Sequence, residues 1–252
     1  MDIKKLKLAL VFLGIALNCH SQTISATDIV KRADDKMRGE KSSYSIMSMK
    51  IVRPTWERTI SFKSWGKGTE LSIVYITGPA KDKGQSFLKI KNEMWSWNPQ
   101  INRTIKLPTS MLSQGWMGSD FTNDDLLNQR SIVVDYNHEL AGEEAISGEL
   151  CHKINLIPKP DAPVVWGKIV MWISKKHEIV FKTEYYDEDK YLVKSEIGKN
   201  LKEMDGRFLL TEFELIPADG EGNKTIITID EIKFNIPIED SFFSQQNMIR
   251  IR

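Results

Sequence analysis

The sequence has little cysteine: of its 252 residues, only Cys19 and Cys151 are cysteines. This count excludes a small scaffold held together by many disulfides. If Cys19 is removed with an N-terminal leader, Cys151 has no partner and cannot form an internal disulfide. We therefore expect the folded part of the chain to be stabilised by packing.

The sequence also lacks an excess of either charge. Lys and Arg together number 35 and Asp and Glu number 34, which gives a net charge of +1. Nucleic-acid-binding domains usually carry a clear basic excess, so we expect no nucleic-acid partner. Apolar residues make up 41% of the chain and charged residues 27%, which is typical of a globular domain.

Long apolar runs are missing as well, apart from ten residues at 8–17 (LALVFLGIAL). As a helix this run spans ~15 Å, about half of the hydrocarbon core of a bilayer. Three lysines precede it and polar residues follow it, which is the pattern of a secretory signal peptide. We predict a signal peptide over residues 1–21 and a single exported domain over 22–252. Two alternatives are a buried N-terminal helix and a lipid anchor at Cys19, as in bacterial lipoproteins.

Recognisable catalytic motifs are absent too. A zinc-protease helix motif begins at His138 but has Gly142 where the second ligand belongs. Cys151 and His152 are neighbours, and neighbouring residues of a strand point to opposite faces, so they cannot act as nucleophile and base. The sequence also contains no nucleophile elbow and no phosphate-binding glycine loop. We therefore predict a protein that is not an enzyme, with no catalytic residues, no metal and no cofactor.

What the sequence does contain is a pattern of one helix followed by many strands. Apolar residues at helical spacing predict a helix over 28–37, with Ser25 as its N-cap. Turn residues then separate twelve predicted strands at 43–53, 56–65, 69–77, 86–90, 93–98, 102–107, 143–157, 165–173, 179–187, 191–198, 207–216 and 224–234. The strand at 165–173 is apolar on both faces and should be covered on both sides. Asp230 and Glu231 interrupt the alternation of the last strand and indicate a β-bulge.

One long stretch, residues 108–128, shows no strand alternation. Thr122 and Asp125 have the spacing of a capping box for a short helix. The apolar side chains of the stretch are Met111, Leu112, Trp116, Met117 and Phe121. Large apolar side chains in an insertion must cover something apolar, so the stretch reads as a lid over a hydrophobic cavity. The alternative is a helical plug that completes the core.

Tryptophan and methionine are abundant, with seven tryptophans and ten methionines. Methionine adapts its shape readily, which suits a surface that receives varied apolar ligands. Trp95 and Trp97 share one face of a predicted strand, and Met47 and Met49 share a face of another. The predicted hydrophobic ligand-binding residues are Met47, Met49, Trp56, Trp95, Trp97, Met111, Leu112, Trp116 and Phe121. The alternative is that these residues fill an ordinary core.

Several short motifs occur in a familiar order after the helix. They are 94–99 (MWSWNP), 103–108 (RTIKLP), 118–126 (GSDFTNDDL) and 232–237 (IKFNIP). In this order, the chain resembles the outer-membrane lipoprotein-sorting family, the LolA-like proteins. The likeness extends over nearly the whole chain after the signal peptide.

This resemblance implies a fold and a function. The implied fold is mainly β, an unclosed antiparallel β-barrel of about eleven strands with helices covering its concave face. The implied function is a monomeric periplasmic carrier that binds acyl chains of lipoproteins or other lipids for outer-membrane sorting. Its partners would include an inner-membrane exporter and an outer-membrane acceptor. Alternatives are an accessory lipid-binding subunit of a membrane lipid exporter, an exported lipid hydrolase and a structural envelope protein.

The resemblance also suggests a residue that controls the lid. In the family's carrier, an Arg followed by Pro near the end of a strand ties the lid down. Arg53 followed by Pro54 is the only such pair in this chain. We therefore take Arg53 as the gating candidate, although counting strands would place the family's pair near residues 66–68.

Overall fold

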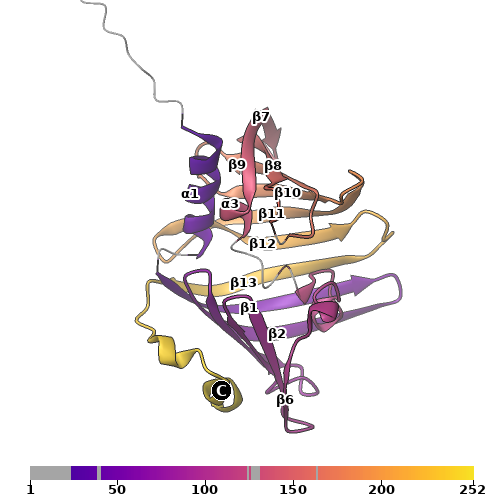
Figure 1. Cartoon of the computed structure of the whole chain (residues 1–252), viewed down its shortest axis with the longest axis vertical. Coiled ribbons are helices and arrows are strands. Elements are labelled where there is room, and N and C mark those ends of the chain that lie inside the picture. The colour runs from indigo at the N-terminus through magenta and orange to yellow at the C-terminus, as the bar shows by residue number, and fades with distance from the viewer. Residues whose placement is uncertain (1–23, 39–40, 124, 126–130, 163) are drawn as a thin grey trace, which may run out of the picture.

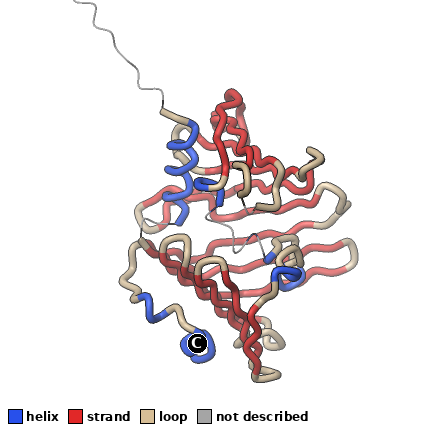
Figure 2. Tube along the Cα trace, viewed as in Figure 1, coloured by secondary structure: helices blue, strands red, loops and turns tan. Residues whose placement is uncertain are grey.

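The computed structural model shows one large antiparallel sheet with a few short helices (Figures 1 and 2). It describes residues 24–38, 41–123, 125, 131–162 and 164–252. The predicted signal peptide and Cys19 therefore lie outside the described residues. None of the helices in the described part of the chain combines the length and apolar character needed to cross a membrane.

The sheet contains thirteen strands in the order β6-β5-β4-β3-β2-β1-β13-β12-β11-β10-β9-β8-β7. The strands are β1 (Ser42–Arg53), β2 (Trp56–Lys67), β3 (Leu71–Gly78), β4 (Ser86–Ile90), β5 (Glu93–Asn98), β6 (Arg103–Lys106), β7 (Tyr136–Ile146), β8 (Glu149–Pro158), β9 (Lys168–Ser174), β10 (Val180–Tyr186), β11 (Leu192–Met204), β12 (Arg207–Pro217) and β13 (Lys224–Phe234). The two edge strands, β6 and β7, do not pair with each other. The predicted unclosed antiparallel architecture is confirmed, with thirteen strands instead of about eleven.

The strand predicted at 143–157 is wrong as a single element. The chain turns at Ser147 and Gly148 between β7 and β8, which pair as a hairpin. Both turn residues have a positive φ, 51° and 83°, as a two-residue hairpin turn of the mirror-image type requires. This turn carries the dipeptide Ser-Gly, which is itself a turn signal that the predicted strand overlooked.

The first helix forms as its sequence predicts. Helix α1 (Ala26–Arg38) is capped by Ser25, whose Oγ accepts a hydrogen bond from the Asp28 N–H at 3.1 Å. Its apolar side packs on β8 and β9, where Val30 and Ala33 join a buried cluster with Ile154 and Met171. The helix lies across one end of the sheet in Figure 1.

The sheet carries apolar clusters on both of its faces. We call the face that packs against α1 the inner face and the opposite face the outer face. Strand β9 shows both: Ile169 and Met171 belong to the cluster under α1, while Val170 and Trp172 belong to a cluster with Phe181. The prediction that this strand is buried on both sides is confirmed.

The predicted β-bulge in the last strand is also confirmed. Ile46 pairs with Glu231 and the next residue, Met47, pairs with Ile229, so Asp230 is the extra residue of β13. The bulge leaves Ile229 and Ile232 on the same face of the strand.

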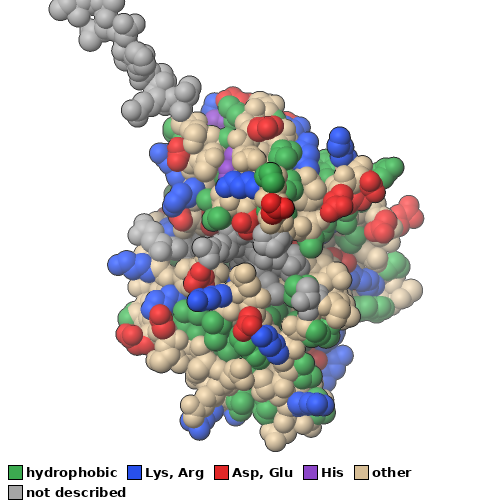
Figure 3. Space-filling model, viewed as in Figure 1, with side chains coloured by type: hydrophobic (Ala, Val, Ile, Leu, Met, Phe, Trp, Pro, Cys, Tyr) green, Lys and Arg blue, Asp and Glu red, His purple; other side chains and the backbone are tan. Residues whose placement is uncertain are grey.

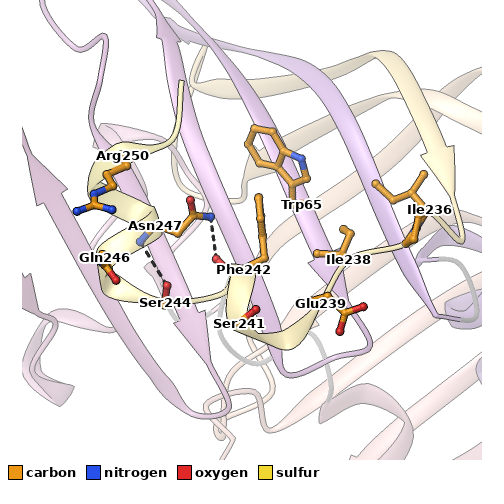
Figure 4. Close-up of a pocket in the computed structure, with 11 residues that line it drawn as sticks. Trp65, Ile236, Ile238, Glu239, Ser241, Phe242, Ser244, Gln246, Asn247 and Arg250 are labelled. Atoms are coloured by element: carbon orange, nitrogen blue, oxygen red, sulfur yellow. Dashed lines mark hydrogen bonds between the residues drawn. The ribbon is translucent and has the colours of Figure 1, made fainter.

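The C-terminal tail covers the outer face of β3–β5. It contains the short helices η4 (Asp240–Phe242) and α4 (Gln245–Arg250). Phe243 and Met248 are buried there, and the Ser86 hydroxyl donates a hydrogen bond to the Met248 carbonyl at 2.6 Å. A pocket of about 600 Å³ lies between this tail and Trp65 (Figure 4). None of its lining residues belongs to the cavity of the inner face described next.

Candidate functional site

The inner face holds a cavity with two lobes. The first lobe has a volume of about 260 Å³ and lies over β1–β5. The second has a volume of about 280 Å³ and lies between α1 and β9–β13. Met37, Met47 and Ile227 line both lobes, so the lobes adjoin. Together they reach the size range of ligand pockets, roughly 300–1,000 Å³, and we call them the inner cavity.

Five of the predicted ligand-binding residues come together on the inner face. They belong to one apolar cluster over β1 and β2, and they are Met47, Met49, Leu112, Trp116 and Phe121. Met47 lines both lobes, Trp116 lines the first and Phe121 lines the second. Because Trp116 and Phe121 come from the insertion between β6 and β7, this insertion forms part of the cavity wall.

Two further predicted residues lie outside the cavity. Trp56 is 50% exposed at the tip of the β1–β2 hairpin, where the Arg53 guanidinium lies 5.8 Å from its ring centre. Met111, at the end of the short helix η1 (Thr109–Met111), is 36% exposed. Neither residue is among those that line the two lobes.

The expectation that Trp95 and Trp97 line the same cavity requires correction. Trp95 pairs with Leu88 across β4 and β5, and both pack in the outer-face cluster under the C-terminal tail. Their neighbour Met94 points to the other side and lines the first lobe. Alternation along β5 therefore turns Met94 towards the cavity and the two tryptophans away from it.

Trp116 places an unpaired hydrogen-bond donor at the cavity. It is 3% exposed, and its ring makes edge contacts with Phe62 at 5.7 Å and Phe87 at 5.4 Å between ring centres. Among the described residues, its indole Nε1 has no hydrogen-bond partner. A buried N–H without an acceptor costs about 1–3 kcal/mol.

Arg53 ties the insertion to the sheet. Its two terminal nitrogens donate to the two carboxylate oxygens of Asp120 at 3.0 and 2.9 Å, and one also donates to the Gly118 carbonyl at 3.2 Å. Asp120 accepts a further hydrogen bond from the Thr225 hydroxyl of β13 at 2.7 Å. The Arg53 and Asp120 side chains are 16% and 10% exposed, so this pair is largely removed from water.

A second ion pair ties the insertion to β11. Lys194 Nζ lies 2.5 Å from Asp125 Oδ2, and both side chains are nearly buried. The Lys194 ammonium also lies over the rings of Trp166 and Tyr185, at 4.8 and 5.1 Å from their centres. Sequence reasoning missed this pair because the two residues are 69 positions apart. Lys194 gave no signal of its own, because β11 carries several other charged residues.

The predicted capping box explains how Asp125 is held. The Thr122 N–H donates to the Asp125 carboxylate at 2.7 Å, and the Asp125 N–H donates to the Thr122 hydroxyl at 3.1 Å. This reciprocal pair is the predicted capping geometry. The helix expected through Leu126 and Leu127 lies outside the described residues.

The second lobe contains one carboxyl group with unusual chemistry. Glu196 of β11 lines it together with Asp34, Thr183 and Tyr185. Burial raises the pKa of Glu196 to about 7, with nearby Lys194 lowering the pKa and Asp125 raising it. Sequence reasoning did not identify Glu196, although it alternates with Lys194 on the same face of the strand.

Among the described residues, neither a reactive thiol nor a metal-binding cluster is found. The thiol of Cys151 is buried in the outer-face cluster, and burial raises its pKa to about 11. It therefore stays protonated and unreactive at neutral pH. In the described part of the chain, no group of three or more His, Cys, Asp and Glu side chains is placed to hold a metal ion. Charges of both signs are interspersed over the face shown in Figure 3.

Comparisons with solved structures place this fold among known proteins. A DUF1329 family protein from Desulfovibrio piger matches with a TM-score of 0.81 and 24% identity, over 88% of this chain and 97% of that one. A LolA superfamily protein from Nitrosomonas europaea matches with a TM-score of 0.75 and 23% identity, over 88% and 99% of the two chains. A putative outer membrane lipoprotein-sorting protein domain from Vibrio parahaemolyticus has a TM-score of 0.75 and 18% identity, over 90% and 100%. Comparison with curated proteins gave no match.

These similarities define the class of the protein, which has the LolA-like fold that the sequence motifs predicted. A family model with the description "Uncharacterized protein" matches residues 68–250. Because this match covers more than two thirds of the chain, the chain belongs to that family.

Proposed function

We propose that this protein is a non-enzymatic periplasmic carrier that binds the acyl chains of a lipoprotein or another lipid in the inner cavity. The observation that carries this proposal is the cavity itself, a two-lobed space with mostly apolar walls beneath an insertion. The similarity to proteins named for lipoprotein sorting supports the same assignment. In this role, the chain would be exported by its N-terminal segment and would exchange cargo with an inner-membrane exporter and an outer-membrane acceptor.

The apolar walls can supply the binding energy without a catalytic or ionic anchor. Moving a CH₂ group from water to an apolar site gains roughly 0.8 kcal/mol, so a sixteen-carbon chain gains roughly 11 kcal/mol before losses of freedom are counted. Met47 and Ile227 line both lobes, and we propose that one chain extends from the first lobe into the second.

The insertion is proposed to act as the lid. Arg53 holds it from β1 through Asp120, and Lys194 holds it from β11 through Asp125. Release of these pairs would uncover Trp116 and Phe121 and open the cavity to a ligand. Arg53 is therefore retained as the gating candidate, with Lys194 as a second tether.

The test compares two changes at Met47, which lines both lobes. Met47→Glu places a carboxylate in the apolar wall, at a cost of several kcal/mol when a chain covers it, so acyl binding should fall about a hundredfold or more. Met47→Leu keeps the apolar volume and should change affinity only a few-fold. The measurement is displacement of a fluorescently labelled acyl ester, with circular dichroism to verify folding.

A matched control uses the same chemical change elsewhere. Phe208 on β12 is 47% exposed and lines neither lobe, so Phe208→Glu should leave acyl binding unchanged. Equal binding by folded Met47→Glu and wild-type protein would refute acyl binding in the inner cavity. Native mass spectrometry of the purified protein would separately reveal an acyl lipid that co-purifies.

A further inference from the structure

The polar side chains that line the second lobe of the inner cavity all end in oxygen atoms. Its polar lining residues are Asp34 of α1, Thr183 and Tyr185 of β10 and Glu196 of β11. Two are carboxyl groups and two are hydroxyl groups, and no Lys, Arg or His is among the described residues that line the lobe. The other residues that line the second lobe are apolar, whereas the first lobe is also lined by Lys89 and by serine and threonine hydroxyls.

The cation next to Glu196, Lys194, already forms an ion pair with another carboxylate. Lys194 lies on the same strand as Glu196, but its ammonium contacts the Asp125 carboxylate at 2.5 Å. Glu196 itself makes no side-chain hydrogen bond to another described residue. The charged and titratable groups around it are Lys194 on β11, Asp125 of the insertion, Asp34 of α1 and Tyr185 of β10.

The adjoining lobe is also lined by a residue with a buried polar atom. Trp116 is 3% exposed and lines the first lobe, and its Nε1 donor has no partner among the described residues. Buried polar groups in proteins are normally hydrogen-bonded. Trp116 therefore adds a second buried polar group, besides Glu196, to the residues that line the inner cavity.

We propose that Glu196 selects the polar end of the bound lipid, favouring an end that carries O–H or N–H donors and no negative charge. This inference rests on the proposed acyl carriage and deepens it. Hydroxyl or ammonium groups would donate to Glu196, whereas a free carboxylate would meet like charge in a low-dielectric site. The ligand class is therefore an acyl ester or amide with hydroxyl or amine groups at its polar end, and not a free fatty acid.

The test measures three ten-carbon amphiphiles by isothermal titration calorimetry at pH 8. These are monodecanoylglycerol, decylamine and decanoate, which share an apolar chain and differ in their polar end. Wild-type protein should bind the first two at least about tenfold more tightly than decanoate, because like charges are brought together only in the decanoate complex. In Glu196→Gln, decylamine should bind more weakly, decanoate more tightly and monodecanoylglycerol within a few-fold of wild type.

A matched control variant and the three affinities of wild-type protein separate the role of Glu196 from acyl carriage itself. Glu203, exposed on the same strand, lines neither lobe, and Glu203→Gln should keep the wild-type preference. Equal binding of the three amphiphiles by wild-type protein, or a preference that survives in Glu196→Gln, would overturn the role of Glu196 while leaving acyl carriage intact. Failure of all three to bind would remove the proposed function and this inference together.

Discussion

The pair of Arg53 and Asp120 provides the sharpest test of how the insertion is held. The two side chains make two hydrogen bonds of 2.9 and 3.0 Å and are 16% and 10% exposed. At an effective dielectric constant of ~20 and a charge separation of ~4 Å, their attraction is about 4 kcal/mol. Loss of hydration offsets part of this, so we expect a coupling energy of about 1–3 kcal/mol.

The measurement is a double-mutant cycle with Arg53→Met and Asp120→Asn, followed by urea unfolding. Hydrogen exchange across residues 111–121 should accelerate in both single variants, because the insertion detaches more easily. The control cycle uses Arg32→Met and Glu178→Gln, a pair at 3.1 Å with about half of each side chain exposed, which should couple by less than about 1 kcal/mol. A coupling for Arg53 and Asp120 no larger than the control, with unchanged exchange across 111–121, would refute the idea that this pair holds the insertion.

Three further predictions concern other parts of the molecule. Burial raises the pKa of Glu196 to about 7 from an ordinary 4.5. The native protein therefore binds this proton more tightly than the unfolded protein does, and it loses stability as the pH rises from 4.5 to 7. Glu196→Gln should therefore raise the free energy of unfolding by about 1–3 kcal/mol at pH 8 and by almost nothing at pH 4, and an equal effect at both would contradict this. Phe243→Ala should lower the free energy of unfolding by about 3–4 kcal/mol, yet it should leave acyl affinity within twofold because Phe243 packs on the outer face. Loss of acyl binding by the folded variant would contradict the placement of the binding cavity on the inner face alone. The Cys151 thiol, buried and with a pKa of about 11, should react with a thiol reagent only after denaturant is added, and rapid reaction of the native protein would show that the site is open.

Sequence alternation could predict most of the sheet because each strand keeps a period of two. It could not predict which face of β5 is the inner one. Both faces of this strand are covered by apolar material, the insertion on one side and the C-terminal tail on the other. Trp95 and Met94 therefore carry the same signal of burial, and only the tertiary arrangement of the tail decides between them.

The polar part of the candidate site was less accessible to sequence reasoning. Lys194 and Glu196 read as two ordinary charges of a strand, and their meaning depends on Asp125 arriving from a distant segment. Arg53 could be singled out because the resemblance pointed to an Arg-Pro pair at a strand end. Its partner Asp120 lies in a stretch without periodicity, so no spacing argument could connect them.

The open sheet has a consequence for self-association. An unclosed sheet leaves rows of backbone donors and acceptors at its two edges, which can template fibres between copies of a protein. Here β6 offers only four residues, and β7 is interrupted by a register shift between Leu140 and Gly142. The exposed carboxylates of Glu143 and Glu144 also place charge on this edge strand, which disfavours edge-to-edge pairing. The sheet can thus remain unclosed while its two edges resist polymerisation.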